Sequence, residues 1–159
     1  MQLKRHKGHE REFPNAHIYH ALLPVVFISI WFLDSFFFEF STVLNHYIPF
    51  LIRLSLFILI FGIALIFIYL SHNTLFKTHE PPDSLITDGI FKYTRNPMYF
   101  GILLIYIASL AFSISLIAAL LIPVIFYVYN RMVNFEENVL FEMFGEEYKS
   151  YQAKVPKWI

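Results

Sequence analysis

Two short polar segments in an otherwise apolar chain carry residue types that could bind a charged small molecule. The first spans 89–101 and contains Arg95, Asn96 and Pro97. Asn is a preferred N-cap and Pro is tolerated at the first helical position, so this triplet predicts a helix start. The unpaired N–H groups of that first turn, together with the guanidinium, favour an anionic group. The segment therefore predicts a binding site for a small charged ligand.

The second segment places two carboxylates, Glu136 and Glu137, beside the apolar side of a predicted helix. Polar residues at three- and four-residue spacing form a separate stripe on that helix: Arg131, Asn134, Asn138 and Glu142. A buried ionised carboxylate is costly unless it is paired. We therefore expect a cation close to the two glutamates, supplied by Arg95, by a lysine or by a ligand, and we expect the two segments to meet.

The composition places both segments in a membrane protein. The chain has 159 residues, of which 57% are hydrophobic and 15% charged, with long runs that carry no charge. Such runs are typical of integral membrane proteins. The length favours a single domain over 1–159. The absence of Cys excludes disulfides and thiolate metal sites, and no metal site is expected.

An all-α fold with four transmembrane helices in two hairpins is expected. The first hairpin comprises 20–39 and 48–71. The second lies within 98–129, which at ~1.5 Å per residue is too long for one crossing. Ser113 and Ser115 mark its turn. Each of its arms is then slightly short for a full crossing.

The last helix is expected to continue beyond the membrane into a cytoplasmic C-terminal segment. Pro123 should kink this helix within the membrane. Polar periodicity continues to Phe144, and Gly145 should then end the helix.

Two ionisable residues lie inside the first hairpin at similar depth. Asp34 is near the end of the first expected span and Arg53 is near the start of the second. Because charges in lipid normally face a partner, an Asp34–Arg53 ion pair is expected.

The distribution of charge predicts the topology. Apart from Arg53, every Lys and Arg lies in the N-terminal tail 1–19, in the loop 72–96, or after 129. The positive-inside rule places these segments, and hence both termini, in the cytoplasm. Within the loop, Pro81 and Pro82 exclude a continuous helix, and the loop should fold over the predicted helix start.

The order and spacing of the two motifs resemble a known family of membrane enzymes. The resemblance covers about 72–159 and rests on Thr87-x-Gly89-x-Phe91-x-x-x-Arg95-Asn96-Pro97-x-Tyr99-x-Gly101, followed by Glu136-Glu137-x-x-Leu140-x-x-x-Phe144-Gly145-x-x-Tyr148-x-x-Tyr151-x-x-x-Val155-Pro156. This pattern is similar to the isoprenylcysteine carboxyl methyltransferase and phospholipid methyltransferase superfamily. The resemblance implies an integral membrane methyltransferase that uses S-adenosylmethionine.

The resemblance also implies which residues form the site. The donor would be bound by Tyr93, Arg95, Asn96, Pro97, Tyr99, Gly101, Glu136 and Glu137. Many relatives have His at the position of Asn96, so this side chain suits positioning rather than proton transfer. Arg95, Glu137 and Lys154 are the expected catalytic residues. Lys154 stands where relatives that act on a prenylcysteine carboxylate carry Arg, and it keeps the charge without the bidentate grip.

The acceptor is expected to be a lipid or a lipophilic small molecule, and no nucleic acid is expected as a partner. A prenylated cysteine, a phospholipid amine, a thiol and a quinone-like lipid all remain open. Two other functions remain as alternatives. Membrane sterol reductases bind NADPH with a similar Arg-x-Pro-x-Tyr segment, and a non-catalytic membrane scaffold could keep the glutamates only to pair with Arg95.

Overall fold

The computed structural model describes residues 13–75 and 84–159, and all regular structure within these ranges is helical. The α-helices are α1 (Ala16–Phe32), α2 (Phe50–Leu75), α3 (Pro97–Phe112), α4 (Leu116–Ala119), α5 (Ile122–Phe144) and α6 (Glu146–Lys154). A π-helical turn extends α1 over Leu33–Phe38, and 3₁₀ turns occupy Val43–His46 and Gly89–Lys92. Expectations for 1–12 and for Pro81 and Pro82 lie outside the described residues.

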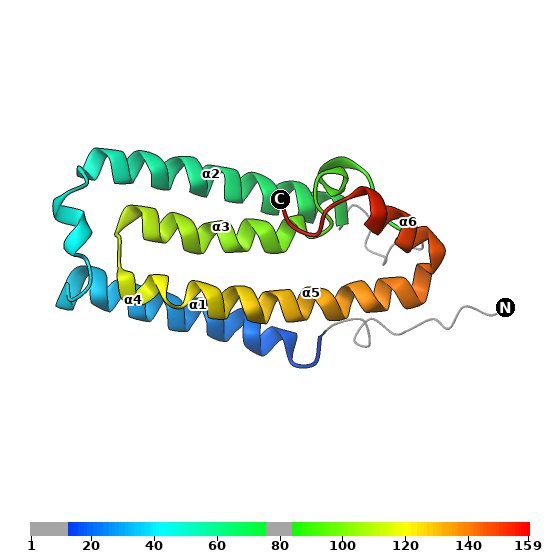
Figure 1. The fold of residues 1–159 in the computed structure, drawn as a ribbon, viewed down its shortest axis with the longest axis horizontal. Coiled ribbons are helices and arrows are strands. Elements are labelled where there is room, and N and C mark those ends of the chain that lie inside the picture. The colour runs from blue at the N-terminus through cyan, green and yellow to red at the C-terminus, as the bar shows by residue number, and fades with distance from the viewer. Residues whose placement is uncertain (1–12, 76–83) are drawn as a thin grey trace.

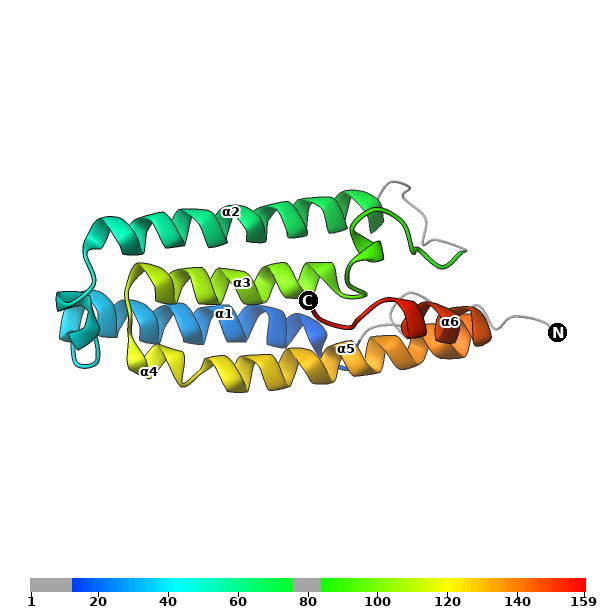
Figure 2. The same ribbon diagram turned by 45° about the horizontal axis from the view of Figure 1, so that its top comes forward.

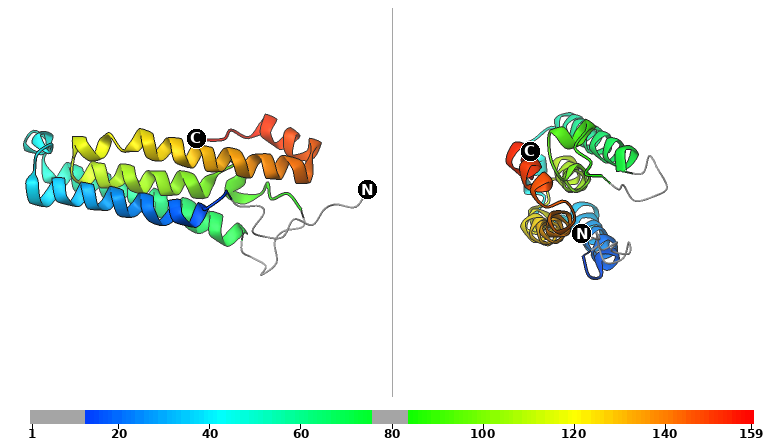
Figure 3. Two further views of the ribbon diagram at one scale, coloured as in Figure 1. Left: turned by 90° about the horizontal axis from the view of Figure 1, so that it is seen from below. Right: turned by 90° about the vertical axis from the view of Figure 1, so that its right-hand side faces the viewer.

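The long helices form an antiparallel bundle (Figure 1). The α1–α2 and α3–α5 connections lie at one end, and the end of α2, the start of α3 and the end of α5 lie at the other. Figure 2 shows α6 turning back along α5, so that the C-terminus returns towards the start of α3. Seen along the bundle, α3 lies between α2 on one side and α1 and α5 on the other (Figure 3).

Three helical stretches are long and apolar enough to cross a membrane: Ala16–Phe38, Phe50–Leu75 and Leu116–Phe144. The fourth, Pro97–Phe112, is apolar but shorter. Of the apolar 18-residue core of the second stretch, only 6% is buried inside the bundle. An apolar surface of this extent is expected to face lipid, in agreement with a membrane protein.

The second hairpin turns where expected but is not kinked as expected. α3 ends at Phe112, and Ser115 caps α4 by accepting a hydrogen bond from the backbone N–H of Ala118. Pro123 lies in the first turn of α5, after the break that ends α4, so it begins a helix rather than bending one. This position costs nothing because the N–H that proline lacks would have had no helical partner.

The expected Asp34–Arg53 ion pair is wrong: in the described part of the chain, the two side chains bind other partners. Asp34 is buried and accepts hydrogen bonds from the backbone N–H of Ser41 at 3.0 Å, from the Ser41 hydroxyl, and from the Ser115 hydroxyl at 2.5 Å. Three donors can stabilise a buried carboxylate without a cation. Asp34 thereby ties the end of the first span to the start of α4.

Arg53 instead binds carbonyl groups at the same end of the bundle. It donates to the backbone oxygens of Phe112 at 2.7 Å and Ile48 at 3.2 Å, and to the Asn45 side-chain oxygen at 2.9 Å. The Phe112 carbonyl belongs to the last turn of α3, where carbonyls lack helical partners. Arg53 therefore acts as a C-terminal cap for α3 from the neighbouring hairpin.

The close packing of α2 on α3 depends on Gly101. A Cβ atom at this position would lie 2.7 Å from Cγ1 of Ile68 and 2.9 Å from the backbone oxygen of Ala64, both on α2. Without a side chain here the two backbones can approach, as small residues allow in membrane helix pairs.

We expect Gly101→Ala to lower the free energy of unfolding by about 1–3 kcal/mol, because α2 must move away or distort. Gly62→Ala on α2 is the matched control, since nothing lies within 4 Å of the added Cβ. The control should leave stability unchanged or raise it by up to about 1 kcal/mol. Equilibrium unfolding in detergent measures both, and equal effects would contradict the close approach.

Candidate functional site

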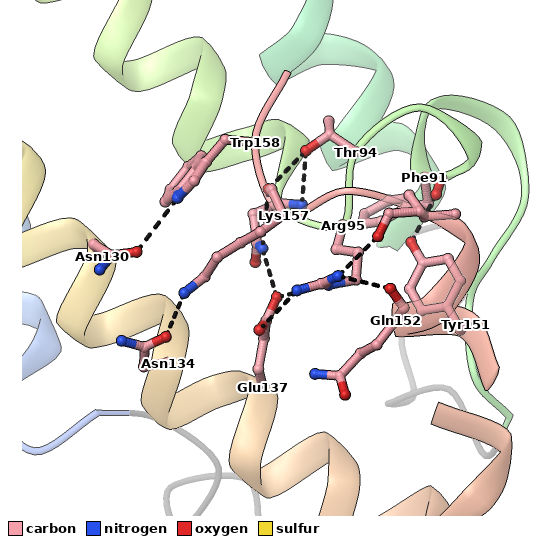
Figure 4. A network of polar contacts seen from close by, with 12 residues as sticks. Phe91, Thr94, Arg95, Asn130, Asn134, Glu137, Tyr151, Gln152, Lys157 and Trp158 are labelled. Carbon is pink, nitrogen blue, oxygen red and sulfur yellow. Dashed lines mark hydrogen bonds and ion pairs between the residues drawn. The ribbon is translucent and has the colours of Figure 1, made fainter. Parts of the chain in front are cut away.

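The structure brings the two polar segments together through a buried ion pair between Arg95 and Glu137 (Figure 4). Nε of Arg95 lies 2.9 Å from Oε1 of Glu137, and Nη2 lies 3.2 Å from Oε2, so the contact is bidentate. The two side chains are only 12% and 9% exposed. Glu137 therefore has the cation that its position on the apolar side of α5 required.

Arg95 also holds the C-terminal segment. Its Nη1 group donates to the backbone oxygens of Gln152 at 3.2 Å and Val155 at 2.7 Å, and its backbone N–H donates to Pro156 at 3.0 Å. Burial acts to lower the pKa of Arg95, but the hydrogen bonds and negative charge of Glu137 raise it overall. The guanidinium therefore stays charged and joins α3, α5 and α6.

Asn96 occupies the N-cap position of α3, but its side chain does not cap the helix. The amide nitrogen Nδ2 instead donates to Oε1 of Glu137 at 3.0 Å. Pro97 is in the first turn, as expected, and is buried. The carboxylate of α5 has thus drawn the Asn96 side chain away from the N–H groups at the start of the helix.

Glu136 points to a different neighbour from Glu137. Its Oε1 accepts a hydrogen bond of 2.5 Å from the hydroxyl of Tyr99, which is only 9% exposed. Consecutive residues are separated by about 100° around a helix, so adjacent glutamates on α5 face different surroundings. Glu136 is half-buried and lies on the α3 side of α5 with Tyr99.

Two tyrosines of α6 complete the buried surroundings. The Tyr151 hydroxyl donates to the backbone oxygen of Phe91 at 2.6 Å, whereas the buried Tyr148 hydroxyl has no hydrogen-bond partner within the described residues. Burial raises the pKa of Tyr151 to about 12 and also raises the pKa of Tyr148. Both phenols therefore remain protonated at neutral pH and can act as donors.

Within the described residues, three of the expected site residues make no side-chain hydrogen bond or ion pair with Arg95 or Glu137. Gly101 faces α2, because two residues along a helix correspond to about 200° of rotation from Tyr99. Tyr93 is 68% exposed, and Lys154 is exposed in the last turn of α6.

A different lysine, Lys157, lies near the site. Its ammonium group donates to the side-chain oxygen of Asn134 on α5, and its backbone oxygen accepts from Thr94 at 2.9 Å. Burial lowers its pKa. Next to it, Trp158 donates to Asn130 at 3.3 Å.

The contacts of this C-terminal segment with α5 place it across the site. Spacing along the chain gave no signal for them, since they join residues more than twenty positions apart.

The chain matches the family model described as phospholipid methyltransferase over residues 50–147, a range that contains both halves of the ion pair. It is 30% identical over 76 residues to Protein-S-isoprenylcysteine O-methyltransferase of Schizosaccharomyces pombe, covering 47% of this chain and 32% of the relative. It is 31% identical over 112 residues to Methanethiol S-methyltransferase of Pseudomonas deceptionensis, covering 64% of this chain and 42% of the relative.

A third relative is Protein-S-isoprenylcysteine O-methyltransferase B of Arabidopsis thaliana, 26% identical over 81 residues that cover 50% of this chain and 41% of the relative. The chain therefore spans less than half the length of these relatives. No solved structure shows a significant match.

We expect Arg95→Ala to lower the free energy of unfolding by about 3–5 kcal/mol, because it leaves Glu137 buried without a cation. Lys92→Ala is the matched control: its ion pair with Asp88 is 3.4 Å long, but the two side chains are 62% and 87% exposed. Its loss should change stability by less than about 1 kcal/mol. Equilibrium unfolding in detergent compares the two variants, and similar losses would show that the buried pair does not hold the helices together.

Proposed function

Because the chain belongs to the phospholipid methyltransferase family, we propose that it transfers a methyl group from S-adenosylmethionine to a lipophilic or membrane-partitioning acceptor. The family match agrees with the resemblance drawn from the two motifs, and the named relatives are methyltransferases. The observation that carries the proposal is the Arg95–Glu137 pair, because it assembles both family motifs into one buried polar site.

The residues of the site fit the proposed donor. S-adenosylmethionine carries a sulfonium, an ammonium and a carboxylate. The Glu136 carboxylate and the ring face of Tyr99 suit a cation. The Tyr148 hydroxyl is buried without a hydrogen-bond partner in the described chain, so it is a polar group that a ligand would satisfy. When bound, the donor supplies a methyl group activated by a positively charged sulfur.

Arg95 and Glu137 act in this proposal mainly by positioning. Four of the five guanidinium N–H groups can be assigned to Glu137, Gln152 and Val155, which leaves Arg95 little capacity for a further anion. The pair instead fixes the start of α3 against α5, and so sets the place of Tyr99 and Glu136. Methyl transfer depends chiefly on alignment in a site that excludes water, to which such positioning contributes.

Tyr93 and Lys154 remain predictions from the family resemblance. Both side chains are exposed. We place them at the mouth of the site, where they would meet a ligand before it is buried.

We further propose four membrane crossings, with both termini and the α2–α3 connection in the cytoplasm. The antiparallel bundle supports this, since the basic segments that follow α2 and α5 lie at the same end (Figure 1). Pro97–Phe112 would be the shortest crossing, at roughly 24 Å against a hydrocarbon core of about 30 Å. The site would then open to the cytoplasm for the donor and to the bilayer for the acceptor.

We expect detergent-purified protein to bind radiolabelled S-adenosylmethionine, and Glu136→Gln to weaken this binding by about 10–100-fold. The reason is that a hydrogen bond or contact to a charged group contributes about 1.5–3 kcal/mol. The matched control is Glu142→Gln, an exposed glutamate on the same helix, which should leave the Kd unchanged. Binding of NADPH without S-adenosylmethionine would favour a reductase, and binding of neither would favour a scaffold.

A further inference from the structure

Three rings from three different helices meet beside the proposed donor site. The ring of His20 on α1 lies 5.8 Å from that of Tyr99 on α3 and 5.9 Å from that of Tyr129 on α5, measured between centroids. The two tyrosine rings are 5.7 Å apart, so the three are in mutual contact. His20 and Tyr129 belong to neither family motif and are far from Tyr99 in the sequence.

This cluster is continuous with the donor site on one side and with the apolar interior on the other. Tyr99 donates its hydroxyl to Glu136 at 2.5 Å. The hydroxyl of Tyr129 lies 3.2 Å from that of Tyr106, whose ring is 4.8 Å from Phe27. A row of tyrosine rings, Tyr99, Tyr129 and Tyr106, thus leads from the polar end of the bundle into its apolar core.

His20 is the accessible member of the cluster. Its side chain is exposed, whereas Tyr99 and Tyr129 are only 9% and 1% exposed. An acceptor that approaches through the side of the bundle would meet His20 before it reaches Glu136. The adjacent tyrosine faces, inclined to the imidazole by 29° and 32°, restrict the orientation of the ring.

We propose that His20 is the general base of the reaction and that the acceptor is a thiol. This proposal rests on the methyl-transfer function proposed above. The acceptor's proton passes to an imidazole nitrogen of His20, and the electron pair left on the acceptor sulfur forms the bond to the methyl carbon. The pair of the broken carbon–sulfur bond stays on the donor's sulfur, which becomes neutral. The imidazolium then releases its proton to water.

A comparison of the pKa of imidazole with the pKa of each possible acceptor favours a thiol. An unperturbed imidazole has a pKa of about 6.5, a cysteine-like thiol about 8.5, a phenol about 10 and an alkylammonium about 10.4. Proton transfer to imidazole is therefore uphill by about two pKa units from a cysteine-like thiol and by about four from an ammonium or from the phenol-like hydroxyl of a reduced quinone. A carboxylate acceptor is already ionised at neutral pH and needs no base. A histidine at this position is useful only for an acceptor that must lose a weakly held proton.

We expect His20→Gln to slow methyl transfer to the octyl ester of N-acetylcysteine, a lipophilic acceptor with a cysteine-like thiol, at pH 7 by about 10²–10⁴-fold while the Kd for S-adenosylmethionine stays unchanged. His17→Gln is the matched control, because His17 is another exposed histidine of α1 and, within the described residues, its ring does not contact Tyr99 or Tyr129. It should transfer at the wild-type rate. The rate of His20→Gln should recover as the pH rises through about 8.5, where the thiol ionises by itself.

Among the residues that the structure describes, the titratable groups around His20 include Tyr99 and Tyr129, with Glu136 reached through Tyr99. A thiolate-dependent recovery is distinguished from their titration by repeating the pH series with thiols of different acidity. The recovery should follow the pKa of the thiol. A recovery at one fixed pH for all thiols would overturn the role of His20 as a base.

A second readout does not depend on turnover. A diazirine-bearing alkanethiol photolysed with the donor-free protein should label α1 around His20 or α5 around Tyr129, and 1-octanethiol should compete. Labelling confined to α2 would overturn the acceptor position. Wild-type transfer to no thiol, or unchanged transfer by His20→Gln, would overturn the proposal while donor binding still supported the methyltransferase. Failure to bind the donor would instead remove the proposed function, and this inference with it.

Discussion

The bidentate contact between Arg95 and Glu137 is the interaction on which the polar end of the molecule depends. Both groups are almost fully buried, so each would be costly without the other. The same guanidinium binds carbonyl oxygens of α6 and of the segment that follows it. One side chain therefore determines how the start of α3, the extension of α5 and the C-terminal segment are placed relative to one another.

The opposite end of the bundle is held by polar groups in the same way. Asp34 accepts hydrogen bonds from two serines, and Arg53 binds the carbonyl oxygen at the end of α3. Between lipid-exposed helices, burial of apolar surface provides little driving force, because lipid tails are as apolar as the side chains. Hydrogen bonds at the two ends and the close approach at Gly101 therefore contribute strongly to how these helices pack.

The two glutamates of α5 have separate tasks because they are adjacent rather than one turn apart. Glu137 is neutralised by Arg95 and accepts a further hydrogen bond from Asn96, so its role is to hold the helices together. Glu136 instead faces Tyr99, and through that ring the aromatic cluster that includes His20. This division places the proposed donor site and the proposed acceptor route on either side of a single tyrosine.

The sequence by itself determined the helical class, the turn at Ser113–Ser115 and the end of α5 at Gly145, because these follow from local composition and backbone preferences. It also indicated that Glu137 required a cation. Only the tertiary structure decided which one, and it replaced the expected Asp34–Arg53 pair with two separate sets of partners. The contacts of His20 and Lys157 were equally invisible in the sequence. Partner choice among distant residues depends on helix rotation and packing, which no local pattern encodes.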